Sequence, residues 1–128
     1  MAREVIHSDN APKAIGPYSQ AIRVDAGKMI FCSGQVPLVP ATMEFNSQDV
    51  VEQTHQVMKN LEAVLAAAGA KFENVVRTTI FLTNLGDFAK VNEAYGKYFP
   101  ANPPARATVQ VAALPKGAQV EIDCIAVI

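Results

Sequence analysis

The longest regular run of apolar positions lies in the middle of the chain and predicts a helix. Between residues 50 and 68 these positions recur at spacings of three and four, which places them on one helical face. Asn46 or Ser47 can cap its N-terminus, while Asp49 suits the positive end of the helix dipole. Gly69 follows the last turn, where a left-handed backbone is favoured. The face is formed by Val50, Thr54, Val57, Met58, Leu61, Val64, Leu65 and Ala68.

Shorter apolar runs rich in β-branched residues predict six strands, with one more helix between them. This second helix is expected to be capped by Asp87 and to stop before Pro100. The segment 25–28 (DAGK) has the composition of a hairpin turn, so the strands on either side of it are expected to pair with each other. The expected strands span residues 3–6, 21–24, 29–33, 75–82, 107–111 and 119–128.

The order of these elements predicts an α+β fold with both helices on one side, because two helices can cover only one face of a sheet of about six strands. Neither face of the run 75–82 or of the last strand is polar throughout, so neither face is expected to lie open to water. Burial against identical sheets of other subunits would cover the second face, which predicts a homo-oligomer. In the last strand one face carries Val120, Ile122, Cys124, Ala126 and Ile128, and in the run 75–82 Val75, Thr79 and Phe81 oppose Val76, Thr78, Ile80 and Leu82.

Length and charge narrow the class of protein. A chain of 128 residues has the size of one domain, so residues 1–128 are expected to form a single domain. Charged residues make up only 18%, which also favours a surface buried against another chain. The formal net charge of −1 and the lack of Lys or Arg runs argue against a nucleic-acid partner.

The chain shows no sign of a membrane segment, a disulfide framework or a metal site. No apolar stretch approaches the ~20 residues of a membrane span, and the N-terminal residues lack the apolar core of a signal peptide, so we expect a cytoplasmic protein without a membrane partner. Cys32 and Cys124 lie in apolar runs and are expected to be reduced core thiols, with a reactive thiol as the alternative. No spacing of Cys and His assembles a zinc site, so no metal is expected.

Two charged residues in unusual positions are candidates for chemistry. Arg106 lies at the mouth of a strand, where a guanidinium suits a bidentate grip on a carboxylate; the alternatives are a structural ion pair or an exposed side chain. Glu121 interrupts an aliphatic strand and can serve as a general acid or base. Its alternatives are pairing with Arg77 on a neighbouring strand or exposure at an edge, and Asp123 repeats the same pattern two residues on.

The remaining polar candidates are weaker. Tyr18 lies in a rigid Gly-Pro loop and fits an aromatic wall for a ligand, or else packs over a strand edge. Asn92 lies near the apolar stripe of the second helix. It either donates a hydrogen bond to a ligand or makes a polar contact within the fold. His7 and His55 are interpreted as structural or solvent-facing. Because no nucleophile motif or phosphate-binding glycine loop is present, an enzyme built on this chain would act by positioning and by proton transfer with water.

Short motifs are spread over nearly the whole chain. They are AIGPYSQ at residues 14–20, SGQ at 33–35, VN at 91–92 after Phe88, PAR at 104–106, LPK at 114–116 and VEI at 120–122. In this order they resemble the RidA (YjgF) family of reactive-intermediate deaminases, from about residue 5 to the end of the chain. The stretch 104–122 is similar to the signature of that family, with its Arg and Glu at the expected separation.

The resemblance implies both a fold and an activity. The fold is similar to the chorismate-mutase-like homotrimers, in which a mixed sheet carries two helices on one face and three sheets pack around a central barrel, with clefts between subunits. Archetypal members hydrolyse short-lived enamines and imines, such as 2-aminoacrylate and 2-aminocrotonate, to the 2-keto acid and ammonia. They need no metal or organic cofactor, so the expected partner is a small 2-imino or 2-keto acid and no cofactor is expected.

The resemblance also assigns roles to individual residues. Arg106 matches the arginine that binds the substrate carboxylate, and Glu121 matches the acid that handles the attacking water. Thr108 stands where many bacterial members have Cys, which removes a thiol from the cleft without implying a loss of activity. Tyr18 would come from a neighbouring subunit relative to Arg106. The implied substrate-binding positions are Tyr18, Ser33, Gly34, Phe88, Asn92, Arg106 and Thr108.

Two hypotheses from different classes follow. The chain is a deaminase of enamine or imine intermediates, or it is a non-catalytic ligand-sensing or regulatory module that uses the same cleft and is read by a partner protein. The presence of both Arg106 and Glu121 favours catalysis, because a pure binder would not need an acid opposite the arginine. A ribonuclease, another label used in this family, is disfavoured by the net charge.

Overall fold

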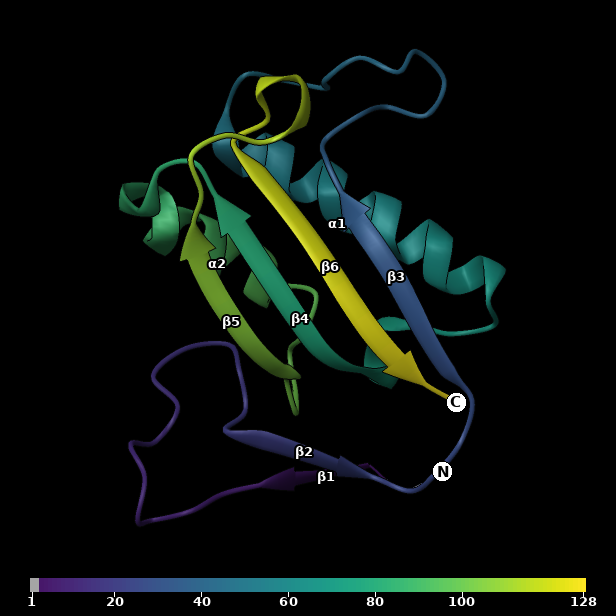
Figure 1. The fold of residues 1–128 in the computed structure, drawn as a ribbon, viewed down its shortest axis with the longest axis vertical. Coiled ribbons are helices and arrows are strands. Elements are labelled where there is room, and N and C mark those ends of the chain that lie inside the picture. The colour runs from purple at the N-terminus through teal and green to yellow at the C-terminus, as the bar shows by residue number, and fades with distance from the viewer. Residues whose placement is uncertain (1–2) are drawn as a thin grey trace.

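The computed structural model describes residues 3–128, which form six strands and two α-helices (Figure 1). Three short 3-10 helices lie in the connections, at Phe72–Asn74, Leu85–Asp87 and Pro115–Gly117. The strands and α-helices are β1 (Arg3–Ile6), β2 (Ala21–Val24), β3 (Met29–Gln35), α1 (Val50–Ala67), β4 (Val75–Leu82), α2 (Phe88–Gly96), β5 (Ala105–Gln110) and β6 (Val120–Val127).

A four-stranded sheet in the order β3-β6-β4-β5 forms the centre of the fold. β5 runs parallel to β4, whereas β6 runs antiparallel to both of its neighbours, so the sheet is mixed. α2 connects the two parallel strands and lies with α1 on one face of the sheet (Figure 1), which confirms the expected α+β arrangement. Asp87 occupies the N-cap position of α2, although its side chain makes no capping hydrogen bond. Within residues 3–128 no helix is long and apolar enough to cross a membrane.

The six strands form two sheets, so the expectation of a single six-stranded sheet is wrong. β1 and β2 form a separate antiparallel pair, and the predicted hairpin between β2 and β3 does not exist. β3 pairs with β6 instead, and Lys28 exchanges backbone hydrogen bonds of 2.8 and 2.9 Å with Ile128. The physical reason is length: β3 has 7 residues and β6 has 8, whereas β2 has 4. Residues 25–28 therefore carry the chain from one sheet to the other.

The side of the central sheet that faces the helices forms the core. A bulge between Val75 and Arg77 shifts the alternation in β4, so Val75 is buried together with Thr78 and not on the opposite face as predicted. Cys32 and Cys124 are buried free thiols on paired strands, which confirms their assignment to the core. The predicted period of two in β6 is confirmed up to residue 126 by the buried residues Val120, Ile122, Cys124 and Ala126. It does not hold beyond, since Val127 is buried and Ile128 is 36% exposed.

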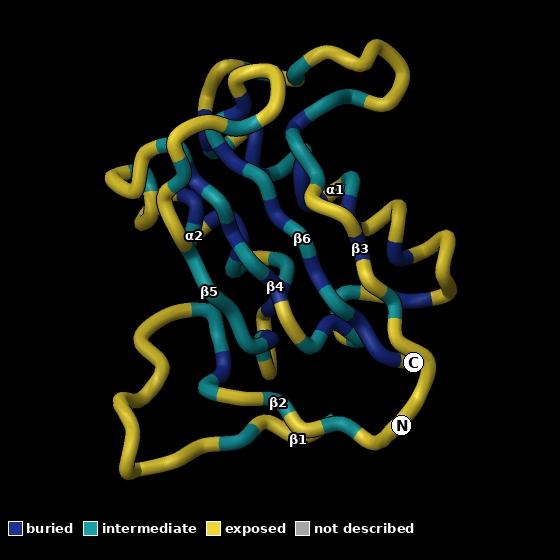
Figure 2. Tube along the Cα trace, in the orientation of Figure 1, coloured by how far each residue is buried: buried dark blue, intermediate teal, exposed yellow. Residues whose placement is uncertain are grey.

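The other face of the central sheet carries exposed apolar side chains. Figure 2 shows exposed stretches along β3, where Met29 is 57% exposed and Phe31 is 69% exposed. Val109 on β5 is also exposed, and both helices lie on the far side of the sheet. Large apolar side chains gathered on one face are typical of a surface that another molecule covers. This face therefore supports the expectation of a homo-oligomer, which stays a prediction.

The N-terminus of α1 is capped by a residue other than those predicted. The Asp49 carboxylate accepts a hydrogen bond of 3.0 Å from the N–H of Glu52, so the predicted caps Asn46 and Ser47 are wrong. These two residues brace the cap, because Ser47 Oγ accepts from the N–H of Asp49 at 3.0 Å and Asn46 Nδ2 donates to the Glu52 carbonyl at 2.8 Å. At the other end, Gly69 has the predicted left-handed backbone, with φ of 77°.

We predict that Asp49→Ala lowers the free energy of unfolding by about 1 kcal/mol, because the N–H of Glu52 loses its acceptor. Urea unfolding followed by circular dichroism measures the change. Lys59→Ala, at an exposed position of the same helix, is the matched control and should change the free energy by less than about 0.5 kcal/mol. Equal effects of the two substitutions would contradict the assignment of the cap.

Candidate active site

Arg106 projects from β5 toward α2 and meets a neutral partner there. Its Nη1 donates a hydrogen bond of 2.6 Å to Oδ1 of Asn92 on α2. The structural ion pair considered for Arg106 is absent, since the ion pairs of residues 3–128 are His7–Asp9 and Arg23–Glu4. The guanidinium is therefore a half-buried positive charge without a counter-ion in the described part of the chain, which suits it to bind an anion.

Three aromatic rings surround the Arg106 guanidinium. Its Cζ lies 5.2 Å from the centre of the Tyr18 ring, 5.6 Å from that of Phe88 and 5.3 Å from that of Tyr95. Burial lowers the pKa of Arg106, while the nearby Tyr95 and Tyr18 act in the opposite direction. Arginine stays protonated under such shifts, and cation–π attraction stabilises the charge in place.

Beside the guanidinium is a hollow of about 500 Å³ with one charge and mainly apolar walls. Arg106 and Thr108 line it from β5, since residues two apart on a strand share a face. The Thr108 hydroxyl is buried and has no hydrogen-bond partner among residues 3–128. Tyr18, Leu85 and Phe88 complete the lining. Such a hollow can hold a small carboxylate with a short apolar chain.

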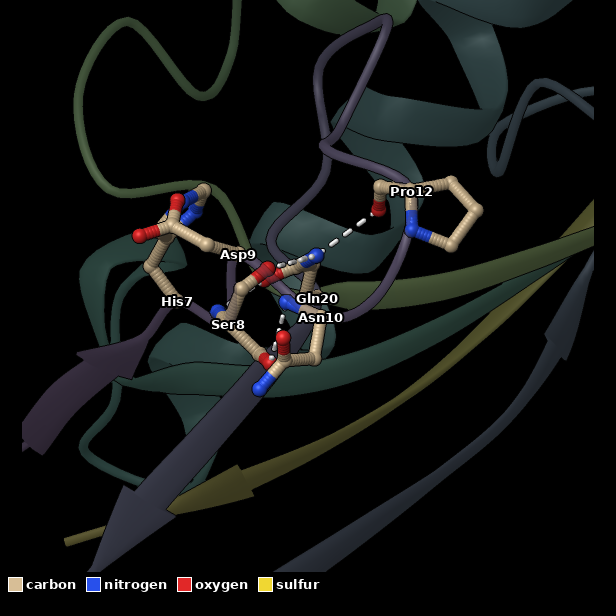
Figure 3. A network of polar contacts seen from close by, with 6 residues as sticks. All are labelled: His7, Ser8, Asp9, Asn10, Pro12 and Gln20. Carbon is tan, nitrogen blue, oxygen red and sulfur yellow. Dashed lines mark hydrogen bonds and ion pairs between the residues drawn. The ribbon is translucent and has the colours of Figure 1, made fainter.

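The loop between β1 and β2 brings Tyr18 to Arg106. Gln20 holds this loop together, as Figure 3 shows: its side chain accepts from the N–H of Ser8 at 2.6 Å and donates to the Pro12 carbonyl at 2.7 Å. The N–H of Ser19 donates to the carbonyl of Pro104 at 3.1 Å, which ties the loop to the segment before β5. The loop is therefore fastened at both the strand pair and the site.

The expectation that Tyr18 comes from a neighbouring subunit is wrong, because its ring contacts Arg106 of the same chain. The close fit of the loop explains why. A Cβ atom on Gly16 would lie 3.1 Å from Asn92 Nδ2 and 3.7 Å from Arg106 Nη2, so a larger residue here would crowd the Asn92 side chain. The Gly-Pro-Tyr segment is thus part of the wall around its own arginine.

Glu121 lies on the opposite face of the sheet from Arg106. In the register of the strands Arg106 pairs with Thr78, which is buried toward the helices. Glu121 pairs with Phe81, three residues further along β4 and therefore on the other face. The two residues that the sequence singled out for chemistry are thus separated by the sheet within one chain.

Glu121 lies against Gly34 near the end of β3. The pairing of β3 with β6 shifts between Cys32 and Gln35, which is typical of a bulge. A Cβ atom on Gly34 would lie 2.1 Å from Glu121 Oε2, so glycine is needed for the carboxylate to rest on the bulge. The ion pair with Arg77, one of the alternatives considered for Glu121, is absent from the described chain, where neither residue is in an ion pair.

The structure therefore brings the expected site residues together in two groups. One group contains Tyr18, Phe88, Asn92, Arg106 and Thr108, and the other contains Gly34 and Glu121. Ser33 lines a hollow with Arg77 and Asp123 and belongs to neither group. The histidines belong to neither: His7 contacts Asp9, and His55 lies 2.8 Å from the Tyr98 hydroxyl. Among residues 3–128 no cluster of three or more His, Cys, Asp or Glu side chains could hold a metal ion.

Sequence reasoning missed two residues that form the surroundings of Arg106. Tyr95 shares one face of the second helix with Phe88 and Val91 by its spacing, and its contact with a charge has no signal in that pattern. Leu85 is an apolar residue in the polar turn that precedes α2, and it is 46% exposed. An apolar side chain in a turn is the one signal that could have identified it.

Comparison with known proteins gives consistent matches over the whole chain. The family model described as Endoribonuclease L-PSP matches residues 8–128. Protein DfrA of Myxococcus xanthus is 71% identical over 99% of this chain and 97% of its own length. The mouse 2-iminobutanoate/2-iminopropanoate deaminase is 52% identical over 98% of this chain and 91% of its own length.

Solved structures match as well. The crystal structure of RidA from an Antarctic Psychrobacter superposes with a TM-score of 0.77 at 44% identity, covering 98% of this chain and 99% of the other. Escherichia coli TdcF with bound serine has a TM-score of 0.75 at 42% identity and covers 98% of both chains.

We predict that Tyr95 makes stability fall at alkaline pH. Burial raises the pKa of Tyr95 from 10.0 to about 12, although the Thr78 hydrogen bond and the Arg106 charge lower it. Between these values the unfolded chain releases the phenol proton and the folded chain keeps it, so the free energy of unfolding falls as pH rises. Urea unfolding is measured at a series of pH values in this range. The free energy of unfolding should fall more steeply with pH in wild type than in Tyr95→Phe, and the two slopes should differ by at most about 1.4 kcal/mol per pH unit. Parallel curves would contradict this.

Proposed function

Because this chain belongs to the Endoribonuclease L-PSP family, which includes the RidA and YjgF proteins, we propose that it hydrolyses reactive 2-enamine and 2-imine acids to 2-keto acids and ammonia. The observation that carries the proposal is the Arg106 guanidinium, which is caged by aromatic rings and has no counter-ion within residues 3–128. A 2-imino acid has the carboxylate that such a cation binds, and it has the short chain that the adjoining hollow can hold.

The relatives support this class of substrate. The name of the mouse relative states activity on 2-iminobutanoate and 2-iminopropanoate. TdcF was solved with serine, a small molecule with a carboxylate and a nitrogen on the neighbouring carbon. Among the alternatives, cleavage of RNA fits poorly, because a formal net charge of −1 gives no electrostatic attraction to phosphates.

The reaction needs positioning and proton transfer. A 2-enamine acid first becomes its imine when a proton is added at C3 and lost from nitrogen. Water then adds to the imine carbon while a base takes one proton from that water and passes it to the nitrogen, which gives a carbinolamine. The base next moves the remaining hydroxyl proton to the nitrogen as the C=O bond forms, so that the C–N bond breaks and ammonia leaves. We assign carboxylate binding to Arg106 and the proton transfers to Glu121. The imine carbon is already electrophilic, so holding water beside it supplies much of the catalysis.

One chain does not bring these two groups to the same ligand, because the sheet separates them. We therefore propose that the site is completed between subunits, with Arg106 from one copy and Glu121 from the next. Packing of the uncovered sheet faces would create such clefts, and it would bury the exposed Met29 and Phe31. A homotrimer would then contain three equivalent sites.

The first prediction of this proposal concerns Arg106. A serine dehydratase generates 2-aminoacrylate, semicarbazide traps the imine that survives, and added wild-type protein should lower the rate of trapping, because the 2-keto acid reacts with semicarbazide more slowly than the imine does. Arg106→Ala should lose at least about 100-fold in kcat/KM, because the substrate carboxylate loses its charge-assisted hydrogen bonds and the substrate is no longer oriented. Arg106→Lys should recover little, since an ammonium cannot bind a carboxylate bidentately.

The outcome separates the two functional hypotheses. An active Arg106→Ala protein would contradict the proposed role of the arginine. A wild-type protein without effect on the rate of trapping would contradict the deaminase and favour the ligand-sensing module. Lys97→Ala, at an exposed position at the end of α2, serves as the surface control and should keep full activity.

The second prediction concerns the shared site. Arg106→Ala and Glu121→Gln proteins should each be inactive alone. When they are unfolded together and refolded in equal amounts, random assembly gives intact sites at about a quarter of the interfaces, so about a quarter of wild-type activity should return. A mixture that stays inactive, although mass spectrometry shows mixed oligomers, would contradict a site formed between subunits.

A further inference from the structure

The question that the site leaves open is what keeps Arg106 in place when no ligand is bound. A long arginine side chain has many conformers, and no carboxylate holds it within residues 3–128. Its hydrogen bond to Asn92 fixes one nitrogen of the guanidinium. The plane and direction of the group must therefore depend largely on the rings around it.

Tyr95 is the ring whose own position is most firmly fixed. It is fully buried, whereas Phe88 is 36% exposed and Tyr18 lies in a loop. The Tyr95 hydroxyl lies 2.8 Å from the Thr78 hydroxyl, and its ring centre lies 5.0 Å from that of Phe99. One contact holds the tip of the side chain and the other holds its flank, so the ring has little freedom to move.

Thr78 links this ring directly to the arginine. It is the β4 residue that pairs with Arg106 on the neighbouring parallel strand, and both side chains point to the helix side of the sheet. Thr78 is only 1% exposed, and a buried hydroxyl needs a partner. The Tyr95 hydroxyl is that partner, so satisfying one buried group places the ring beside the guanidinium of the adjacent strand.

We propose that Thr78 and Tyr95 are positioning residues, and that their buried hydrogen bond fixes the aromatic ring that holds Arg106 in its ligand-binding orientation. The pair does not touch the substrate. It acts by reducing the conformational freedom that Arg106 would lose on binding, which is how preorganisation raises affinity. The sequence alone places Tyr95 on the apolar face of the second helix, and the link of both residues to the site follows from the register of β4 with β5.

The kinetic test rests on the proposed function and compares Tyr95→Leu with Tyr95→Phe. Loss of the ring in Tyr95→Leu should raise KM for a 2-imino acid roughly 5- to 30-fold, with a smaller change in kcat. Tyr95→Phe keeps the ring and should raise KM less. Adding Thr78→Val to Tyr95→Phe removes the orphaned hydroxyl and should bring KM back toward the wild-type value. Met58→Ala, equally buried on α1, is the control for lost stability and should leave KM unchanged.

A spectroscopic test does not depend on the proposed function. The Nε–H signal of Arg106 can be observed by ¹H–¹⁵N NMR and identified by its loss in Arg106→Lys. In wild type it should be shifted by the rings and protected from exchange with water. Tyr95→Leu should lose the shift and the protection, whereas Met58→Ala should keep both.

The two tests fail in different ways. If Tyr95→Leu has the same Arg106 signal and the same KM as Met58→Ala, the positioning role is overturned. If wild-type protein shows no deaminase activity, the proposed function is lost, and the NMR comparison alone decides whether Thr78 and Tyr95 hold Arg106.

Discussion

A half-buried positive charge that has no negative partner among residues 3–128 is the constraint on which this structure depends. The Arg106 guanidinium is withdrawn from water, which is unfavourable unless other groups stabilise it. One amide oxygen from Asn92 and three aromatic rings stabilise the guanidinium. Two parts of the chain supply these groups: the loop before β2 provides Tyr18, and α2 provides Phe88, Asn92 and Tyr95. Because these groups are neutral, the positive charge of Arg106 stays available to bind an anion.

The same sheet that holds Arg106 keeps it away from Glu121. Alternation along the strands sends one side chain toward the helices and the other toward the uncovered face. The uncovered face also carries Phe31, which is 69% exposed. Apolar exposure and an incomplete site therefore occur together. Association of several copies would relieve both, which is why we treat assembly and activity as one proposal.

Much of the fold could be predicted from the sequence, because α1 and β6 carry strong periodic patterns that local burial alone produces. The pairing of β3 could not, since the turn at residues 25–28 resembles a hairpin and only the longer partner strand decides against it. Arg106 and Glu121 were recognised as unusual by their positions among apolar residues. Their separation by the sheet depends on strand register, and the contact of Tyr95 with Arg106 depends on tertiary packing. Neither leaves a signal in spacing.

The central claim is that one ligand is held by Arg106 of one copy and reached by Glu121 of another. A crystal structure of the protein with bound 2-oxobutanoate, the product of 2-iminobutanoate hydrolysis, tests it most directly. The account predicts the ligand carboxylate paired with Arg106 beside Tyr18, and a Glu121 carboxylate from a second copy within hydrogen-bond distance of the 2-keto oxygen. A ligand that sits on Arg106 with no Glu121 near it, or one bound away from Arg106, would contradict the account.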